Sequence, residues 1–342
     1  MIQMKIIEGR VRLAASDVAN FLACRRLTQL DLLRARGELR PPREFDIGFQ
    51  DLVRRGEVHE RAMLERFRAD GLDVVDVSGA QDAAGATREA IQAGAAVVYQ
   101  GTLAGGGPGA PLFGRPDFLV RAGLLPAPGG EPRPDGVHYE VVDAKLARSA
   151  KARAVLQTSF YSHLLAGVQQ VEPRWMHLAL GNGEFASFKV GDFAAYERQT
   201  RRLLAAAIGG DPAGGVYPEP VEHCAICRWR ELCADRRRDD DDLSLVAGMT
   251  TGQRQARLQV ASEDDGMVDV PLDAARGRVP LGPEPGGGDD VEHGVDRTVH
   301  DEVMAHLRHS CSSLELCAPE GSQLQQGYVT RVGSGSPGRG AV

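Results

Sequence analysis

The sequence predicts an α/β fold in which a mixed central sheet is flanked by helices. Short apolar runs rich in β-prone residues alternate along the chain with longer segments whose apolar residues recur at helical spacing. Gly- and Pro-rich stretches at 105–111 and 126–136 interrupt this alternation. Both stretches are expected to be loops between strands.

The expected elements follow one another from residue 16 to residue 208. Ser16 and Asp17 are good N-cap residues, and the first helix is expected to continue from them through Leu33, carrying Cys24. Further helices are expected at 48–69, 82–94, 150–169 and 192–208. Strands are expected at 72–77, 96–103, 112–120, 137–145, 175–180 and 185–190, the last two as a hairpin.

Charge divides the chain into two parts. Residues 1–238 carry 32 Lys and Arg against 29 Asp and Glu, whereas residues 239–342 carry 8 against 18, so their net charges are +3 and −10. The first part is compatible with a phosphate-backbone ligand. The second part is acidic and rich in Gly and Pro, so we expect it to be mostly disordered. A short helical unit at 244–258 is interpreted as the truncated beginning of a further module.

Hydropathy and cysteine content indicate the compartment. The apolar runs are too short to span a bilayer, and the first residues lack the apolar core of a signal peptide. Six cysteines in 342 residues are too few for a disulfide scaffold. We therefore expect a cytoplasmic protein without a membrane partner.

Asp143 and Lys145 lie two apart at the end of an expected buried strand, so both side chains leave the same face. A carboxylate there can hold a divalent cation while the ammonium faces the same reaction centre, as phosphodiester hydrolysis requires. Of the 40 basic residues only four are lysines, which favours a specific role for a retained lysine. Taken alone, however, Asp-x-Lys is more often an exposed ion pair.

Further polar candidates lie on neighbouring elements. Asp117 is on the expected strand before the Asp143 strand, and two carboxylates that converge in a sheet need a cation or a proton to neutralise them. His59 lies on the second expected helix, and Gln157 and Tyr161 lie four apart on a later one. The plainer alternatives are a surface histidine and a half-buried polar edge.

Cys224, Cys227 and Cys233 form a metal-ligand pattern without a fourth member nearby. Cys-x-x-Cys is typical of metal sites, but no second pair follows at the spacing that zinc sites use. Cys24 is the candidate fourth ligand, although a single cysteine on a helix is more often a small buried hydrophobe.

Together these residues resemble the RecB-like nucleases of the PD-(D/E)xK superfamily, in the branch with an iron-sulfur cluster that includes CRISPR-associated adaptation nucleases and helicase-linked nucleases. The resemblance covers residues 13 to about 238. Its motifs are Cys24, Gly56-x-x-His59, Gly-Arg-Pro-Asp117, Asp143-Ala-Lys145, Gln157-x3-Tyr161, and Cys224, Cys227 and Cys233. Asp143 is a departure, since many relatives carry Glu at that position.

The resemblance implies a restriction-endonuclease-like sheet and a role for each motif. The metal ligands for Mg²⁺ or Mn²⁺ would be His59, Asp117 and Asp143. Lys145 would orient the attacking water, while Gln157 and Tyr161 would position the DNA strand and the lysine. The four cysteines would hold a 4Fe-4S cluster that joins the N-terminal helix to the C-terminal segment of the domain.

The function implied is that of a metal-dependent deoxyribonuclease acting on single strands or DNA ends, in repair, recombination or defence. A helicase on another chain is a candidate partner, because no Lys follows Lys189 and a Walker A motif needs one. Two alternatives stay open at this point: a non-catalytic nucleic-acid-binding module held together by the cluster, and a four-cysteine zinc protein.

Overall fold

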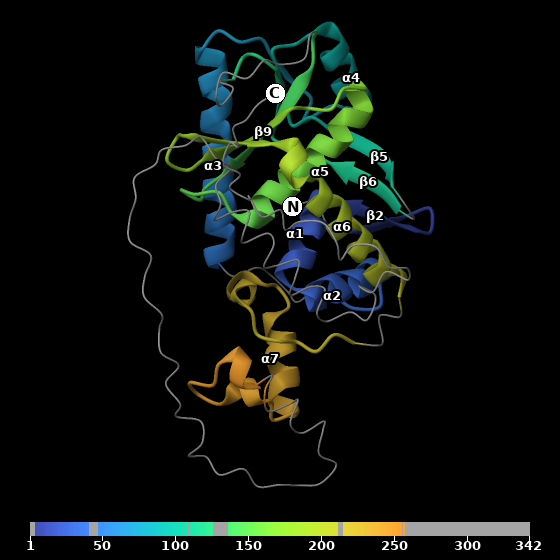
Figure 1. Ribbon diagram of the computed structural model, residues 1–342, viewed down its shortest axis with the longest axis vertical. Helices are drawn as coiled ribbons and strands as arrows, with labels where there is room; N and C mark the ends of the chain where they lie inside the picture. Colours follow the sequence, from blue (N-terminus) through green and yellow to red (C-terminus); the bar gives the residue numbers. More distant parts are fainter. Residues whose placement is uncertain are drawn as a thin grey trace, which may run out of the picture.

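The computed structural model describes residues 4–40, 47–107, 110–125, 136–210, 215–254 and 256 (Figure 1). The prediction of a disordered tail over 239–342 falls almost entirely on residues outside these ranges. Within the expected helical unit at 244–258, residues 251–254 are helical.

The helices are α1 (Ala15–Ala23), α2 (Arg25–Ala35), α3 (Ile47–Ala69), α4 (Ala83–Ala93), α5 (Ala152–Gln169), α6 (Val190–Gly209) and α7 (Arg230–Asp239), with 3₁₀ turns η2 (Glu222–Ile226) and η3 (Leu243–Leu245). The strands are β1 (Lys5–Ile7), β2 (Arg10–Ala14), β3 (Val74–Asp76), β4 (Val97–Tyr99), β5 (Leu103–Gly107), β6 (Ala110–Gly114), β7 (Phe118–Arg121), β8 (Tyr139–Lys145), β9 (Trp175–Leu180) and β10 (Phe185–Lys189). The helices expected from α3 through α6 are confirmed, as is the β9–β10 hairpin.

The main sheet has six strands in the order β10-β9-β8-β7-β4-β3. Strand β8 pairs antiparallel with β7 and parallel with β9, so the sheet is mixed, as the sequence predicts. The pairing of β7 with β8 also confirms that the strands next to Asp117 and Asp143 are neighbours.

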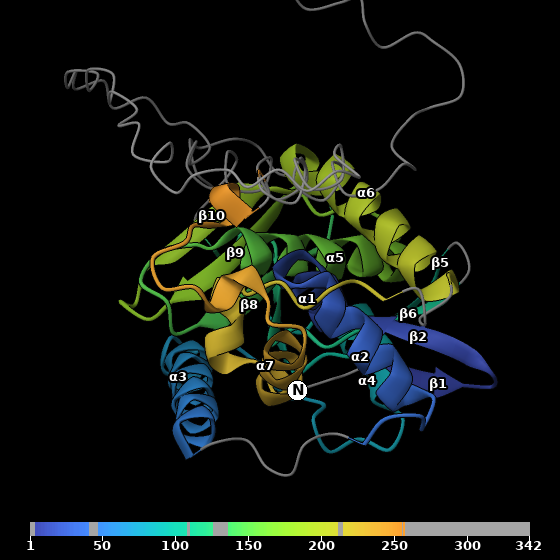
Figure 2. The ribbon, with the colours of Figure 1, turned by 90° about the horizontal axis from the view of Figure 1, so that it is seen from below.

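Strand β8 runs through the middle of the core. Its residues from Tyr139 to Asp143 are all buried, because helices cover both faces of the sheet (Figure 2). On one face Val141 packs in a cluster with Phe160 of α5, and on the other Val142 packs in a cluster with Leu64 of α3. The alternating side chains of β8 therefore place Asp143 and Lys145 on the α5 side.

A second sheet, with strand order β1-β2-β6-β5, was not expected. The single strands predicted at 96–103 and 112–120 are each divided between the two sheets. Gln100 takes a left-handed conformation with φ 56°, and Pro116 has no N–H for a strand ladder, so the chain turns from one sheet to the other at both points.

The predicted first helix is likewise two helices. Cys24 separates α1 from α2 in an extended conformation with φ −166° and ψ 117°. Neither Ser16 nor Asp17 is the N-cap, which is Ala14. Asp17 lies inside the first turn, where its carboxylate accepts hydrogen bonds from the N–H groups of Ala14 and Met4. The break changes the direction of the chain at the thiol of Cys24.

Among the described helices, none combines the length and apolar character that crossing a bilayer requires.

Candidate functional site

Two carboxylates meet where β7 begins and β8 ends. The Ala144 N–H donates to Asp117 Oδ2 at 2.8 Å, which holds the Asp117 side chain against the β8 backbone next to Asp143. Asp143 is only 2% exposed, and its Oδ2 is ion-paired with the Lys145 ammonium. The structure therefore brings Asp117, Asp143 and Lys145 together, as the sequence analysis expects.

The charges of this group perturb one another. Burial, and then the charge of Asp143, raise the pKa of the Asp117 carboxyl well above its ordinary value. Burial by itself lowers the pKa of Lys145, but the carboxylates of Asp143 and Asp117 outweigh it, so the pKa is raised and the ammonium stays charged. The two buried carboxylates share one ammonium, so a proton or a bound cation is needed to offset the second negative charge.

Gln157 and Tyr161 of α5 lie against the same group. The Gln157 side-chain amide donates to the Tyr161 hydroxyl at 3.0 Å. Burial, and then the Asp143 charge, raise the pKa of Tyr161 well above its ordinary value, so its hydroxyl keeps its proton. A neutral hydroxyl beside two carboxylates can donate a hydrogen bond but not act as a base.

His59 contacts the strand next to β8. Its Nε2 lies 3.0 Å from the carbonyl oxygen of Ala179 on β9. Among the described residues, no three His, Cys, Asp or Glu side chains are arranged to hold a metal ion, so the expected three-ligand site of His59, Asp117 and Asp143 is not assembled.

Glu60, the neighbour of His59 on α3, lies within electrostatic range of Asp117. It adds to the rise in the pKa of Asp117, and it accepts a hydrogen bond from the side-chain amide of Gln100. Burial, and then a hydrogen bond with Glu60, raise the pKa of Tyr99 to about 12. The sequence analysis missed Glu60; the available signal was its position next to His59 on the same helix.

A cleft of about 520 Å³ opens beside Lys145. Its walls come from α1, α3, the β8–α5 connection and the cysteine segment around η2. Four cationic side chains are among the described residues that line it, and none of those lining residues is acidic. The cationic lining residues are Lys145, Lys151, Arg153 and Arg228. This volume is in the range of small-ligand sites.

The four cysteines of the sequence motif lie around one small pocket, although Cys24 is 200 positions from Cys224. All four are free and half-buried. Burial, and after it chiefly the neighbouring thiols, raise the pKa of Cys227 to about 11. Among the described residues no three of these thiols are arranged to hold a single ion, and the pocket that they line has a volume of about 10 Å³.

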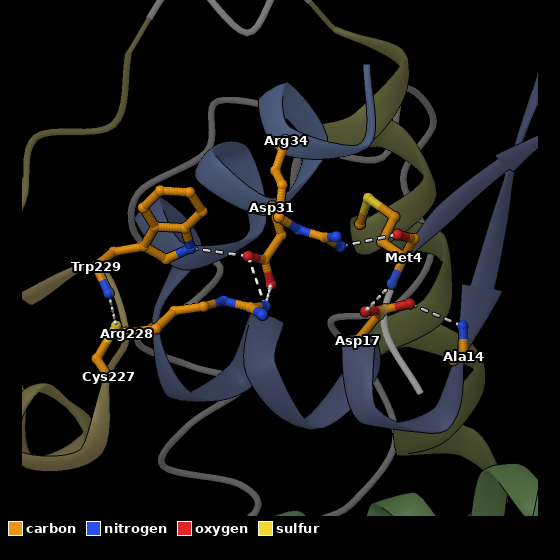
Figure 3. A network of polar contacts seen from close by, with 8 residues as sticks. All are labelled: Met4, Ala14, Asp17, Asp31, Arg34, Cys227, Arg228 and Trp229. Atoms are coloured by element: carbon orange, nitrogen blue, oxygen red, sulfur yellow. Dashed lines mark hydrogen bonds and ion pairs between the residues drawn. The ribbon is translucent and has the colours of Figure 1, made fainter. Parts of the chain in front are cut away.

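Asp31 of α2 ties this cysteine segment to the N-terminal helices (Figure 3). The Arg228 guanidinium donates to both of its carboxylate oxygens at 2.7 Å, and the indole N–H of Trp229 donates to it at 2.8 Å. The backbone N–H of Trp229 donates to Cys227 Sγ at 3.4 Å. Because Cys227 and Arg228 also line the cleft, the cysteine pocket and the cleft share one wall.

Comparisons with known proteins add little to this geometry. No protein-family model and no curated protein matches the chain. The crystal structure of SSO0001 matches with a TM-score of 0.35 and 12% identity, over 67% of this chain and 88% of that one. A likeness at this level supports no conclusion about fold or function.

Proposed function

We propose that this protein is a metal-dependent nuclease that cleaves the phosphodiester bonds of DNA at single strands or ends. The observation that carries the proposal is the group of Asp117, Asp143 and Lys145, whose lysine lines a cleft together with Lys151, Arg153 and Arg228. Paired carboxylates are unfavourable next to a phosphate unless a cation lies between them, whereas the ammonium and the cleft attract phosphate.

The donor set suits Mg²⁺ or Mn²⁺. These hard cations take oxygen ligands, and Mg²⁺ is usually held by one or two carboxylates while waters and substrate phosphates complete its shell. Asp117 and Asp143 supply two carboxylates, so a third side chain such as His59 is not needed. Bound there, the ion would activate a water and offset charge on the phosphate.

The remaining residues have roles that follow from their contacts. Lys145 keeps its positive charge beside Asp143 and would stabilise the charge that develops on the phosphate in the transition state. Gln157 holds the Tyr161 hydroxyl, which would donate a hydrogen bond to a phosphate or to a bound water. Cys24, Cys224, Cys227 and Cys233 would hold the 4Fe-4S cluster as a structural group.

The test is cleavage of end-labelled single- and double-stranded DNA by the full chain, with and without Mn²⁺. We expect cleavage that EDTA stops, and a loss of at least about 100-fold in rate for Lys145→Ala, because one transition-state charge contact is worth this much. Lys145→Arg should fail as well, since the guanidinium is larger and planar. Circular dichroism should show that both variants are folded.

Lys5→Ala is the matched control, because Lys5 lies on exposed β1 and does not line the cleft. Cleavage by Lys145→Ala at the wild-type rate would refute the catalytic assignment. DNA binding without cleavage, in Mg²⁺ and in Mn²⁺, would favour the alternative of a non-catalytic nucleic-acid-binding module.

A further inference from the structure

Arg153 is a cation of the cleft that the proposed reaction does not use. It is the second residue of α5 and lies four and eight residues before Gln157 and Tyr161, so the three side chains leave neighbouring parts of one helix face. Arg153 is exposed at the wall of the cleft, whereas Tyr161 is buried below it. Arg153 thus extends the polar stripe of α5 into the open cleft.

Arg153 differs from Arg228, the other arginine that lines the cleft, because it has no carboxylate partner among the described residues. Arg228 is held by both oxygens of Asp31, and the Lys145 ammonium is paired with Asp143. Among the described residues, Arg153 makes no hydrogen bond or ion pair. Its positive charge is therefore available to a ligand.

Arg153 also lies within electrostatic range of two other residues that line the cleft. It opposes the charged form of Lys145 and, after burial, lowers the pKa of His223. Since Arg228 and Lys145 are already paired with carboxylates, Arg153 leaves positive charge in the cleft that an anion would offset. The planar guanidinium, with its forked donors, suits two oxygens of one phosphate.

We infer that Arg153 binds a phosphate of the nucleic-acid strand next to the one that is cleaved at Lys145. This inference rests on the proposed nucleic-acid substrate. The apolar cleft lining, which includes Leu52 and Val53 of α3 and Ile226 of η2, would then face sugars and bases. Arg153 is in this account a substrate-binding residue, and Lys145 is the catalytic one.

The first experiment measures binding of a fluorescein-labelled 12-nucleotide oligodeoxythymidine by anisotropy, in EDTA so that no cleavage intervenes. Arg153→Ala should weaken binding about tenfold, as expected for one charge-assisted contact. It should also reduce the slope of log Kd against log salt by about 0.7, the value for one phosphate on a single strand. Arg153→Lys should keep the slope and recover part of the affinity, because the charge remains and the fork is lost.

The matched control is Arg88→Ala, since Arg88 is an exposed helical arginine of α4 outside the cleft. Equal affinity and salt slope for Arg153→Ala and Arg88→Ala would overturn the inference. Strands with one neutral methylphosphonate linkage then locate the contact: neutralising the correct linkage should weaken wild type about tenfold but leave Arg153→Ala nearly unchanged. The inference would also be overturned if, at every linkage, the loss of affinity from the neutral linkage simply added to the loss from Arg153→Ala.

Cleavage kinetics separate this inference from the proposed function. Arg153→Ala should raise KM and largely keep kcat, whereas Lys145→Ala should lose kcat. If the wild type binds the strand through Arg153 but does not cut, the nuclease proposal fails and the phosphate site stands. If the wild type binds no strand, both fail.

Discussion

At the scale of single residues, burial decides how the carboxylates of this protein behave. Asp143 is paired with Lys145, and Asp117 accepts a backbone N–H, yet the pKa of Asp117 is raised because burial and a second carboxylate disfavour its charge. Asp17 is a parallel case away from the cleft. Burial raises its pKa to about 7, and the nearby charge of Asp31 adds to the rise against the hydrogen bonds from Ala14 and Met4.

Asp17 should therefore make stability depend on pH. The folded protein keeps this proton up to about pH 7, whereas the unfolded chain loses it near the ordinary Asp pKa of 3.8. Below that value Asp17 is protonated in both states, so it does not make the free energy of unfolding depend on pH. As pH rises from about 4 to 7, its ionisation in the unfolded chain alone should lower the free energy of unfolding by up to about 1.4 kcal/mol per pH unit. Urea unfolding of Asp17→Asn, measured across this range, should lack that component.

The exposed Asp70→Asn is the control, since its side chain lies in solvent at the end of α3. It should keep the pH dependence of the wild type. If the free energy of unfolding depended on pH in the same way for Asp17→Asn and Asp70→Asn, the proposed pKa shift of Asp17 would be refuted.

At the scale of elements, the wall between the cleft and the cysteine pocket depends on one carboxylate of α2. Asp31 is 2% exposed and receives hydrogen bonds from Arg228 and Trp229, both of which precede α7. Trp229, at 1% exposure, packs in a small core with Leu27 and Leu30 of α2. The cysteine segment is thus docked on α2 by an apolar contact and by a nearly buried ion pair.

Asp31→Asn should destabilise this docking by about 3 kcal/mol, because removing one partner of a buried pair leaves the other charge uncompensated. Limited proteolysis should then cut the 215–239 segment faster than in the wild type. Asp235→Asn is the matched control: its pair with Arg238 on α7 is exposed and should contribute less than about 1 kcal/mol. Equal protease resistance of the two variants would show that Asp31 does not hold the segment.

At the scale of the whole molecule, the cysteines connect the beginning of the described domain with its end. Cys24 lies between α1 and α2, and the other three lie at η2 and in α7, yet all four line one pocket. A group bound there closes a loop of about 200 residues. Such a crosslink restricts the unfolded chain and stabilises the fold by a few kcal/mol in the chain-entropy account.

Cys24→Ser should therefore cost as much as Cys227→Ser. In protein purified without oxygen we expect both variants to lose iron and the absorbance near about 400 nm of an iron-sulfur group. Both should also unfold at a lower temperature. Cys311→Ser, outside the described residues, serves as the control and should keep the iron content of the wild type. Full iron in Cys24→Ser would remove Cys24 from the ligand set, and zinc in place of iron would favour the zinc alternative.

Local pattern was sufficient for most elements and for part of the site. Helical periodicity predicted α3 through α6, apolar runs of β-prone residues predicted β8 to β10, and the two-residue spacing of Asp143 and Lys145 put both on one face of β8. These are properties of neighbouring residues, which the backbone geometry of a helix or strand relates directly. The break at Cys24 and the division of two strands between sheets escaped prediction, because they depend on what the chain packs against.

Only the tertiary structure decided which residues from distant parts of the chain meet. His59 and Glu60 are adjacent in sequence, but the packing of α3 turns one toward Ala179 and the other toward Gln100. Arg228 reaches Asp31 across 197 positions. Composition and periodicity carry no record of such contacts, because they are selected by the packing of whole elements after each has formed. The sequence by itself thus determined the elements and the chemistry each can offer, whereas the packing of the sheets and helices decided which side chains of distant elements meet.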